Sequence, residues 1–375
     1  MILTDKVFRG DEEAIYKLRE LYSSYGYTPY KVSKFEEYDL YANNKSFLVS
    51  QNLLTFTDTN GKLMALKPDV TLSIIKNAVA DDNACYKLYY DEHVYRTTSA
   101  NDGFREIMQT GLEVITNIDA YTQCEVIMLA MKSLQSISED YILDLSHMRF
   151  LEGLLEEAGV KADDMSVFLS LIGSKNVPAL KVQCDKLGID SASRDALCEI
   201  TSSYLPIEKA LGLISKMVRG DKMQAAYDEL CTIFSVMKQF GLTDKLYLEF
   251  SVINDMNYYD GIIFKGFING ISDSILSGGR YDKVMEKFGK KTNAIGFAVY
   301  LDKLERFGKQ SESFDVDIML WYDADVEPKC IIETVNVLVA DGKTVKTVSA
   351  LDKNTRCRKL LKLTREGVEV IEAND

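Results

Sequence analysis

Apolar residues recur with helical spacing in two early segments of the chain. Residues 10–24 (GDEEAIYKLRELYSS) place Ile15, Leu18 and Tyr22 along one stripe, with acidic residues near the start. This spacing predicts an amphipathic helix whose first turn favours negative charge. A second helix is predicted through CEVIMLAMKSL, where Asp119 precedes the apolar run and is expected to be the N-cap.

Strand signals surround the second helix and return later in the chain. Two Asn-Gly pairs, at 60–61 and 269–270, each separate runs of β-compatible residues, which predicts two hairpins. The segments 87–97 (KLYYDEHVYRT) and 110–115 (TGLEVI) predict two further strands joined by a polar loop. Strands joined by hairpins favour an antiparallel sheet over a doubly wound parallel one.

Residues 147–241 interrupt this pattern with short amphipathic segments, several of which end at glycine. The predicted helices run through HMRFLEGLLEEAG, MSVFLSLIGS, VPALKVQCDKLG, IEKALGLISKMV and QAAYDELCTIFSVMKQFG. After the second hairpin, the glycine pair of LSGGRYD precedes a further predicted helix in GFAVYLDKLERF. We therefore expect an α+β domain over residues 1–307, in which a helical insertion divides an antiparallel sheet.

A polar linker, GKQSESF, separates a last small unit at residues 315–375. In this unit the strand-like segments VDIMLWY, KTVKTVS and VEVIE alternate with helices predicted through PKCIIETVNVLVADG and NTRCRKLLKLTREG. The β-α-β-α-β order favours a short parallel sheet. The expected architecture is thus a large core followed by a small α/β domain.

The charge balance limits the kinds of partner. The chain has 44 Lys+Arg and 57 Asp+Glu residues and a formal net charge of −13, whereas binding to a phosphate backbone requires a basic surface. The seven cysteines form no CxxC pair and the histidines are His93 and His147, so no metal site is expected. No apolar signal region or stretch of membrane-spanning length occurs. We expect a cytoplasmic protein.

Several polar residues occupy positions that a sheet core would not require. Period two places Gln109, Gly111 and Glu113 on one face of a strand. Carboxylates, amides and hydroxyls at such positions can accept from an ammonium or an imidazole N–H, and the glycine pair at 278–279 allows close approach of a ligand. From spacing alone, a sheet with one solvated face explains the same alternation. The candidate binding residues are Asp69, Thr71, Arg96, Gln109, Glu113, Tyr258 and Tyr259.

These segments resemble the core of histidyl-tRNA synthetases over roughly residues 1–307. LTFTDTNGKLMALKPDVT resembles the hairpin and LRPEGT segment of that family, with Asp69 in place of its glutamate. VYRTT…FREIMQTGLEVI resembles motif 2, in which Arg96 matches the motif arginine and Gln109 and Glu113 match histidine contacts. MNYYDGIIF and SGGRYD resemble the two histidine-specific signatures, and AIGFAVYLDKL resembles motif 3. The resemblance implies a class II aminoacyl-tRNA synthetase fold.

The chain departs from the synthetase pattern at three positions that serve adenylation. Asn254 stands where the RGLDYY-like run of active enzymes carries an arginine, and a neutral amide cannot supply the charge that stabilises the transition state. Thr98 replaces the glutamate of the FRxE segment. Lys303 replaces the arginine of motif 3 that clamps ATP, and so loses a planar, bidentate donor. These losses argue against an adenylating enzyme.

Retention of the histidine-facing residues without the ATP-facing ones resembles the regulatory subunit of ATP phosphoribosyltransferase. LDLSHMRFLEGLLEEAGV, which includes His147, resembles the entry of that family into its insertion. The resemblance implies a non-catalytic chain that binds L-histidine, assembles with the short-form catalytic subunit and carries feedback inhibition. It also implies a homodimer, formed through a motif 1 at YKVSKFEEYDLY, within the hetero-oligomer. No cofactor is implied.

On this resemblance, Glu113 and a tyrosine would contact the imidazole, Asp69, Thr71 and Gln109 the ammonium, and Arg96 the carboxylate. Two alternatives remain at this point: a divergent histidyl-tRNA synthetase, and a synthetase-like tRNA sensor. The final unit resembles a shortened anticodon-binding domain and carries a basic run. On a predicted helix of an acidic protein, this run favours a solvated face over RNA contact. Its members are Lys353, Arg356, Arg358, Lys359, Lys362 and Arg365.

Overall fold

The computed structural model describes most of the chain and divides it into two compact units. The described residues are 10–48, 52–78, 84–97, 103–253, 258–304, 314–352 and 354–374. The first unit is Met1–Phe307 and the second is Gly308–Asp375. Each unit has its own sheet and its own apolar core. Among the described residues, no helix is both long and apolar enough to cross a membrane.

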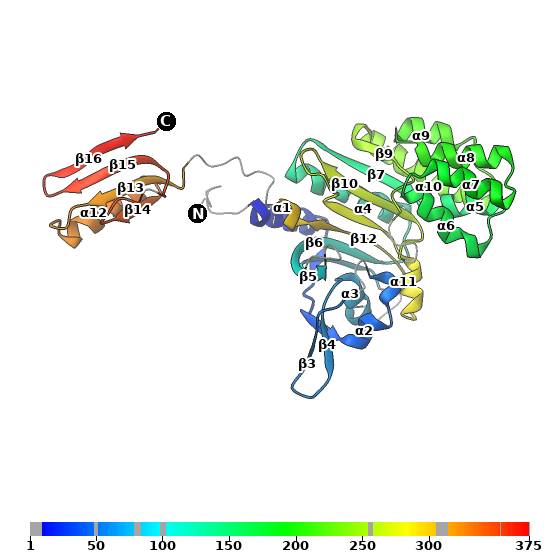
Figure 1. Cartoon of the computed structure of the whole chain (residues 1–375), viewed down its shortest axis with the longest axis horizontal. Coiled ribbons are helices and arrows are strands. Elements are labelled where there is room, and N and C mark those ends of the chain that lie inside the picture. The colour runs from blue at the N-terminus through cyan, green and yellow to red at the C-terminus, as the bar shows by residue number, and fades with distance from the viewer. Residues whose placement is uncertain are drawn as a thin grey trace. The chain divides into compact units, whose positions relative to one another are not determined.

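A large mixed sheet forms the centre of the first unit (Figure 1). From β5 to β7 every neighbouring pair is antiparallel, whereas β1 with β5 and β7 with β9 are parallel. The predicted antiparallel α+β arrangement is therefore confirmed. In spatial order the strands are β1 (Thr28–Pro29), β5 (Tyr86–Thr97), β6 (Phe104–Thr116), β12 (Asn293–Tyr300), β11 (Leu276–Arg280), β10 (Ile262–Ile268), β7 (Tyr141–His147), β9 (Leu246–Leu248) and β8 (Leu205–Pro206).

The two faces of this sheet differ because side chains alternate along each strand. On β6, Leu112 and Val114 point into the main apolar core, which also contains residues of helices α1 (Gly10–Ser24) and α4 (Ala120–Ile137). Both helices are confirmed as predicted, and Asp119 caps α4 by accepting from Thr122 N at 2.8 Å. The opposite face therefore carries the intervening residues of β6.

Both predicted hairpins are confirmed. Gly61, at φ +81°, lies in the turn between β3 (Thr55–Thr57) and β4 (Leu63–Leu66), and Gly270, at φ +90°, lies between β10 and β11. The first hairpin pairs with β2 (Phe35–Glu37) in a small sheet that projects from the large one (Figure 1). It leads into α3 (Thr71–Ala78); the nearby short elements are α2 (Tyr38–Ala42), the 3-10 turn Lys45–Phe47 and, after β11, α11 (Asp282–Lys287).

The helical insertion lies between β7 and β9, as predicted, and its helices gather at one end of the large sheet (Figure 1). One helix, α8, was absent from the predicted set because its sequence is rich in serine, and its buried residues are Ser193, Leu197, Ile200 and Thr201. The insertion contains α5 (Met148–Glu157), α6 (Ala162–Gly173), α7 (Val177–Leu187), α8 (Ser191–Ser202), α9 (Ile207–Ile214) and α10 (Gly220–Gln239), and the 3-10 turn Thr243–Lys245 leads back to the sheet.

The helix predicted for GFAVYLDKLERF is wrong over its first half. Residues 296–300 belong to β12, and Leu301–Leu304 form a 3-10 turn, while 305–307 lie outside the described residues. β12 hydrogen-bonds to β6 on one side and to β11 on the other. The alternation of Phe297 and Val299 into the main core fits this central strand, so long-range pairing overrides the local pattern.

The second unit is a mixed rather than a parallel sheet, because its second predicted helix is wrong. That segment forms β15, which pairs with β16 as an antiparallel hairpin. Leu361 and Leu363 point toward the side of the sheet covered by α12, whereas Cys357 and Leu360 lie in a separate cluster. In order, the strands are β14 (Val345–Val348), β13 (Val316–Tyr322), β15 (Cys357–Thr364) and β16 (Gly367–Ala373), and α12 is Pro328–Ala340.

The basic run therefore follows a strand, and acidic residues accompany it. Arg356 Nη2 lies 3.1 Å from Asp315 Oδ1, and Lys362 Nζ lies 3.1 Å from Asp323 Oδ2. Arg365 lies 3.0 Å from an Asp325 carboxylate oxygen, and Lys353 lies outside the described residues. These ion pairs offset much of the local positive charge.

Candidate histidine-binding cavity

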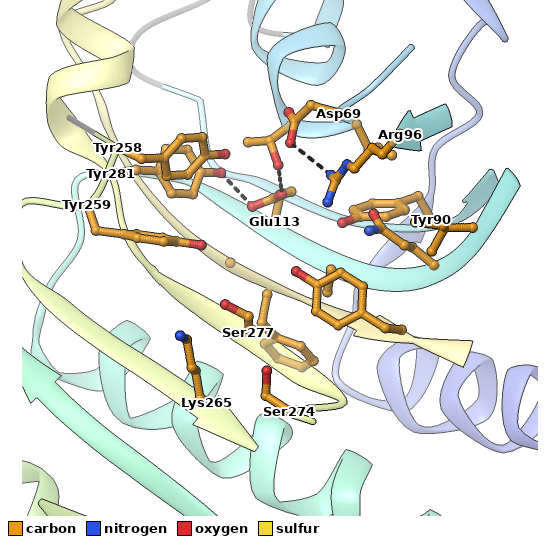
Figure 2. Close-up of a pocket in the computed structure, with 18 of the residues that line it drawn as sticks. Asp69, Tyr90, Arg96, Glu113, Tyr258, Tyr259, Lys265, Ser274, Ser277 and Tyr281 are labelled. Atoms are coloured by element: carbon orange, nitrogen blue, oxygen red, sulfur yellow. Dashed lines mark hydrogen bonds and ion pairs between the residues drawn. The ribbon is translucent and has the colours of Figure 1, made fainter. Parts of the chain in front are cut away.

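A cavity of 510 Å³ opens on the face of the large sheet opposite α1 and α4 (Figure 2). It is lined from β5, β6, β10, β11, β12, the start of α3 and the segment before β10. All of the candidate binding residues line it: Asp69, Thr71, Arg96, Gln109, Glu113, Tyr258 and Tyr259. Three positions depart from the catalytic residues of the synthetases. Of these, Lys303 also lines the cavity, whereas Thr98 and Asn254 lie outside the described residues.

Glu113 is the most completely enclosed carboxyl group of the cavity. It accepts a hydrogen bond from Thr71 Oγ1 at 2.6 Å and another from Tyr281 Oη at 2.5 Å (Figure 2). Burial raises the pKa of Glu113 to about 8, although both hydrogen bonds act in the opposite direction. Burial in the cavity therefore favours the protonated carboxyl near neutral pH, and a donor or cation from a ligand would favour the carboxylate.

Asp69 and Arg96 form a second polar pair beside Glu113. Asp69 Oδ1 accepts from Leu72 N at 2.9 Å, at the start of α3, and its Oδ2 lies 3.7 Å from Arg96 Nη2. Burial raises the pKa of Asp69 and the nearby guanidinium lowers it in part. Arg96 also donates from Nε to Pro68 O at 2.5 Å. Two of its donor atoms thus hold the segment that carries Asp69.

The cavity also presents donors that a ligand could use. Gln109 Nε2 is buried and has no hydrogen-bond partner in the part of the chain that the structure describes. The rings of Tyr258 and Tyr259 are 4.7 Å apart, and those of Tyr258 and Tyr281 are 5.6 Å apart. Burial raises the pKa of all three phenols well above 10, so they remain neutral donors.

Glycine residues form much of the floor. A Cβ on Gly296 would lie 1.8 Å from Glu113 Oε2, and one on Gly111 would lie 2.5 Å from the Tyr90 hydroxyl. A Cβ on Gly279 would lie 2.7 Å from the ring of Tyr259, so this glycine faces the cavity side chains. Gly278 instead faces Phe264 and Phe297 on the other side of the sheet. Of the glycine pair expected to allow close approach, Gly279 alone is therefore on the cavity side.

Three of these cavity residues were missed in the sequence analysis. Tyr281 belongs to SGGRYD and was not singled out, although a tyrosine beside a glycine pair could have suggested a binding residue. Gly296 becomes informative only through its cross-strand pairing with Glu113. Lys265 could have been suspected, because a lysine in the apolar strand IIFKGF requires an explanation. No group of three metal-ligating side chains occurs within the described ranges.

Comparison with known proteins places the chain in a family. The sequence model of histidyl-tRNA synthetase matches residues 4–304. The chain belongs to the histidyl-tRNA synthetase family. Within this family the solved histidyl-tRNA synthetase from Nostoc sp. PCC 7120 has a TM-score of 0.73 at 15% identity, over 95% of this chain and 88% of that one. The synthetase-like fold expected from the motifs is confirmed.

Curated relatives carry the name that the sequence analysis expects. The ATP phosphoribosyltransferase regulatory subunit of Oceanobacillus iheyensis is 28% identical over 90% of this chain and 84% of its own length. That of Clostridium novyi is 27% identical over 80% of this chain and 74% of its own. A structure from Bacillus halodurans, described as an ATP phosphoribosyltransferase regulatory subunit/histidyl-tRNA synthetase, has a TM-score of 0.76 at 21% identity, covering 97% and 96% of the two chains.

Proposed function

We propose that this chain is the non-catalytic regulatory subunit of ATP phosphoribosyltransferase, and that it binds L-histidine as the feedback inhibitor of histidine biosynthesis. The observation that best supports histidine as the ligand is Glu113, a buried carboxyl group in a polar, tyrosine-lined cavity. Thr71 and Tyr281 position this carboxyl group. The names of the curated relatives support the regulatory role. Histidine would be held without being consumed.

Bound histidine would be held through its imidazole ring and through its α-ammonium group. The Glu113 carboxylate accepts from an imidazole N–H, and Tyr281 and Thr71 hold that carboxylate in place. Asp69, with Thr71 and the side-chain oxygen of Gln109, accepts from the α-ammonium. Contacts with buried polar groups of this kind discriminate strongly, because an analogue without the matching donor leaves such a group unpaired.

The contacts of Lys303 are consistent with a chain that does not adenylate histidine. Its ammonium donates to Ser274 O at 2.9 Å and lies 3.8 Å from Asp273 Oδ2. It therefore holds the segment between β10 and β11, and it lacks the planar fork with which an arginine would stack and pair with ATP. Residues 98 and 254 add to this argument through the resemblance alone.

The partner would be the short-form catalytic subunit. The HisG:HisZ ATP phosphoribosyl transferase complex from Thermotoga maritima contains a chain with this fold, at a TM-score of 0.62 and 19% identity, over 78% of this chain and 97% of that one. We expect a homodimer within such a hetero-oligomer. The second unit, with its basic side chains paired to aspartates, would contribute to packing or docking rather than to RNA binding.

The decisive experiment combines binding with reconstitution. Calorimetry should detect L-histidine binding to the purified chain, and a short-form phosphoribosyltransferase should require the chain for activity and lose activity as histidine is added. By linkage, the state of the complex that is active must bind histidine more weakly by the same factor. Histidine-dependent ATP–pyrophosphate exchange would instead identify a divergent synthetase, and a tRNA gel shift at physiological salt would identify a tRNA sensor.

A further inference from the structure

The cavity has a basic side as well as the acidic side formed by Glu113 and Asp69. Lys265 of β10 lines it, and Figure 2 shows Lys265 and Glu113 on opposite sides with Ser277 between them. β6 and β10 are separated by β12 and β11, which corresponds to about 14 Å at three strand spacings. Lys265 thus offers a cation on the side of the cavity away from Glu113, in a lining that also includes Lys303, Asp273 and Asp302.

The sheet register places small residues between Lys265 and Glu113. Lys265 pairs with Ser277, Ser277 with Ala298, and Ala298 with Gly111. In the neighbouring row, Glu113 pairs with Gly296 and Gly296 with Gly279. The members of these two rows between Lys265 and Glu113 are small: Ser277, Ala298, Gly111, Gly296 and Gly279. The side chains of Tyr259, Tyr90 and Glu113 lie over the three glycines, so Ser277 and Ala298 form the low part of the cavity floor beside Lys265.

The Lys265 ammonium lacks a close counter-charge among the described residues. Asp144 is its neighbour on β7, but no ion pair within 4.0 Å joins them. That carboxyl accepts from Tyr204 Oη at 3.2 Å, and burial raises its pKa to about 7. Burial, with the nearby charge of Lys303, lowers the pKa of Lys265. A half-buried cation in this position would be stabilised by an anion from a ligand.

The arginine expected to contact a carboxylate is already engaged elsewhere. Arg96 donates to Pro68 O and lies beside Asp69, so its placement serves the loop before α3. A ligand carboxylate next to Arg96 would also lie close to the Asp69 carboxyl group. At Lys265, by contrast, a second cation, Lys303, is nearby, and the cross-strand neighbours are the Ser277 hydroxyl on β11 and the Asp144 carboxyl on β7, which forms no ion pair with it.

We propose that Lys265 binds the carboxylate of the amino-acid ligand, while Arg96 positions Asp69. This inference rests on the proposed histidine-binding function and refines it. It makes Lys265 the residue that distinguishes an α-amino acid from the corresponding amine. Histidine would lie across the floor, with its imidazole at Glu113 and its carboxylate at the lysine.

The test compares L-histidine with histamine, which lacks the carboxylate, by calorimetry on the full chain. The wild-type chain should bind histidine ~10- to 100-fold more tightly than histamine, as expected for a hydrogen bond to a charged group. Lys265→Gln should lower histidine affinity by that factor and leave histamine affinity unchanged. Lys265→Arg, which keeps the charge, should retain most of the preference.

Lys245→Gln is the matched control. Lys245 is also half-buried, but it lies over the ring of Tyr141, which belongs to the core on the other face of the sheet. This variant should keep the wild-type preference. Equal losses of histidine and histamine affinity in Lys265→Gln, or no loss of either, would overturn the role of Lys265 while leaving the histidine site intact. A wild-type chain that binds neither ligand would overturn the proposed function itself, and with it this inference.

Discussion

Strands β6 and β15 both alternate polar with apolar residues, yet their charged side chains lie in opposite environments. On β15 the basic side chains reach solvent, and Lys362 lies 3.1 Å from Asp323. On β6, Glu113 is 2% exposed and has hydroxyl partners instead of a cation. The difference shows that alternation alone does not identify a site. We infer that burial of a charge-bearing group without a counter-charge, rather than alternation, distinguishes a candidate ligand-binding strand.

The strongest test of this contrast is the pH dependence of stability. Burial raises the pKa of the Glu113 carboxyl from its usual 4.5 in the unfolded chain to about 8 in the folded one. Between these values the unfolded state has lost a proton that the folded state retains, so the free energy of unfolding falls as pH rises. At about 1.4 kcal/mol per pH unit the upper limit is ~5 kcal/mol.

Glu113→Gln should remove this dependence, because an amide does not titrate and the two hydroxyl partners can reorient. Urea unfolding of the variant and the wild type at pH 5 and pH 8 provides the measurement. The variant should gain stability relative to the wild type at the higher pH. Parallel behaviour of the two proteins across this range would mean that Glu113 is not buried as a neutral acid.

Glu113→Ala tests the same residue as a binding group. Removal of the acceptor leaves the imidazole N–H of histidine unpaired, and affinity should fall by ~100-fold, or about 3 kcal/mol. Isothermal titration calorimetry with L-histidine measures this change. Unchanged affinity would place the ligand elsewhere, even if the wild-type chain binds histidine well.

Gly296→Ala tests whether the floor of the cavity must lack a side chain at residue 296. The added Cβ would lie 1.8 Å from Glu113 Oε2, so the carboxylate or the strand must shift. We expect a loss of ~1–3 kcal/mol in stability, typical of overpacking, together with weaker histidine binding. Gly212→Ala, in α9, is the control, since a Cβ there meets no atom within 4 Å. Similar results for the two variants would argue against a special role for the floor.

The smallest effect on stability and binding is expected for the exposed ion pairs near β15. Arg356→Gln removes an ion pair with Asp315 whose side chains are 59% and 44% exposed. Such pairs contribute less than ~1 kcal/mol, and histidine affinity should stay at the wild-type value. Thermal unfolding and calorimetry provide both readouts. A large change in histidine affinity would show that this segment takes part in binding.

The elements with strong local signals were predictable from the sequence. Helical spacing identified α1 and α4, and Asn-Gly pairs identified both hairpins. β12 and β15 were mistaken for helices because short apolar runs fit either period, and strand pairing with distant segments decides between them. Local sequence does not report such pairing.

The site followed a similar division. The resemblance brought together all the residues that were expected to bind histidine, and they do line one cavity. The hydrogen bond from Tyr281 to Glu113 joins residues 168 positions apart, which spacing does not reveal. The same holds for the separation of Gly278 and Gly279 onto opposite sides of the sheet, since it depends on which strands neighbour β11.

The contact between Gly296 and Glu113 has a consequence for how recognition proceeds. Because the carboxylate occupies the volume that a side chain at residue 296 would fill, and two hydroxyls fix its oxygens, Glu113 has little rotational freedom left before a ligand arrives. Ordering of this group is completed when the chain folds, so association does not repeat that entropic loss. For the proposed histidine ligand, the cavity would therefore act as a preorganised template.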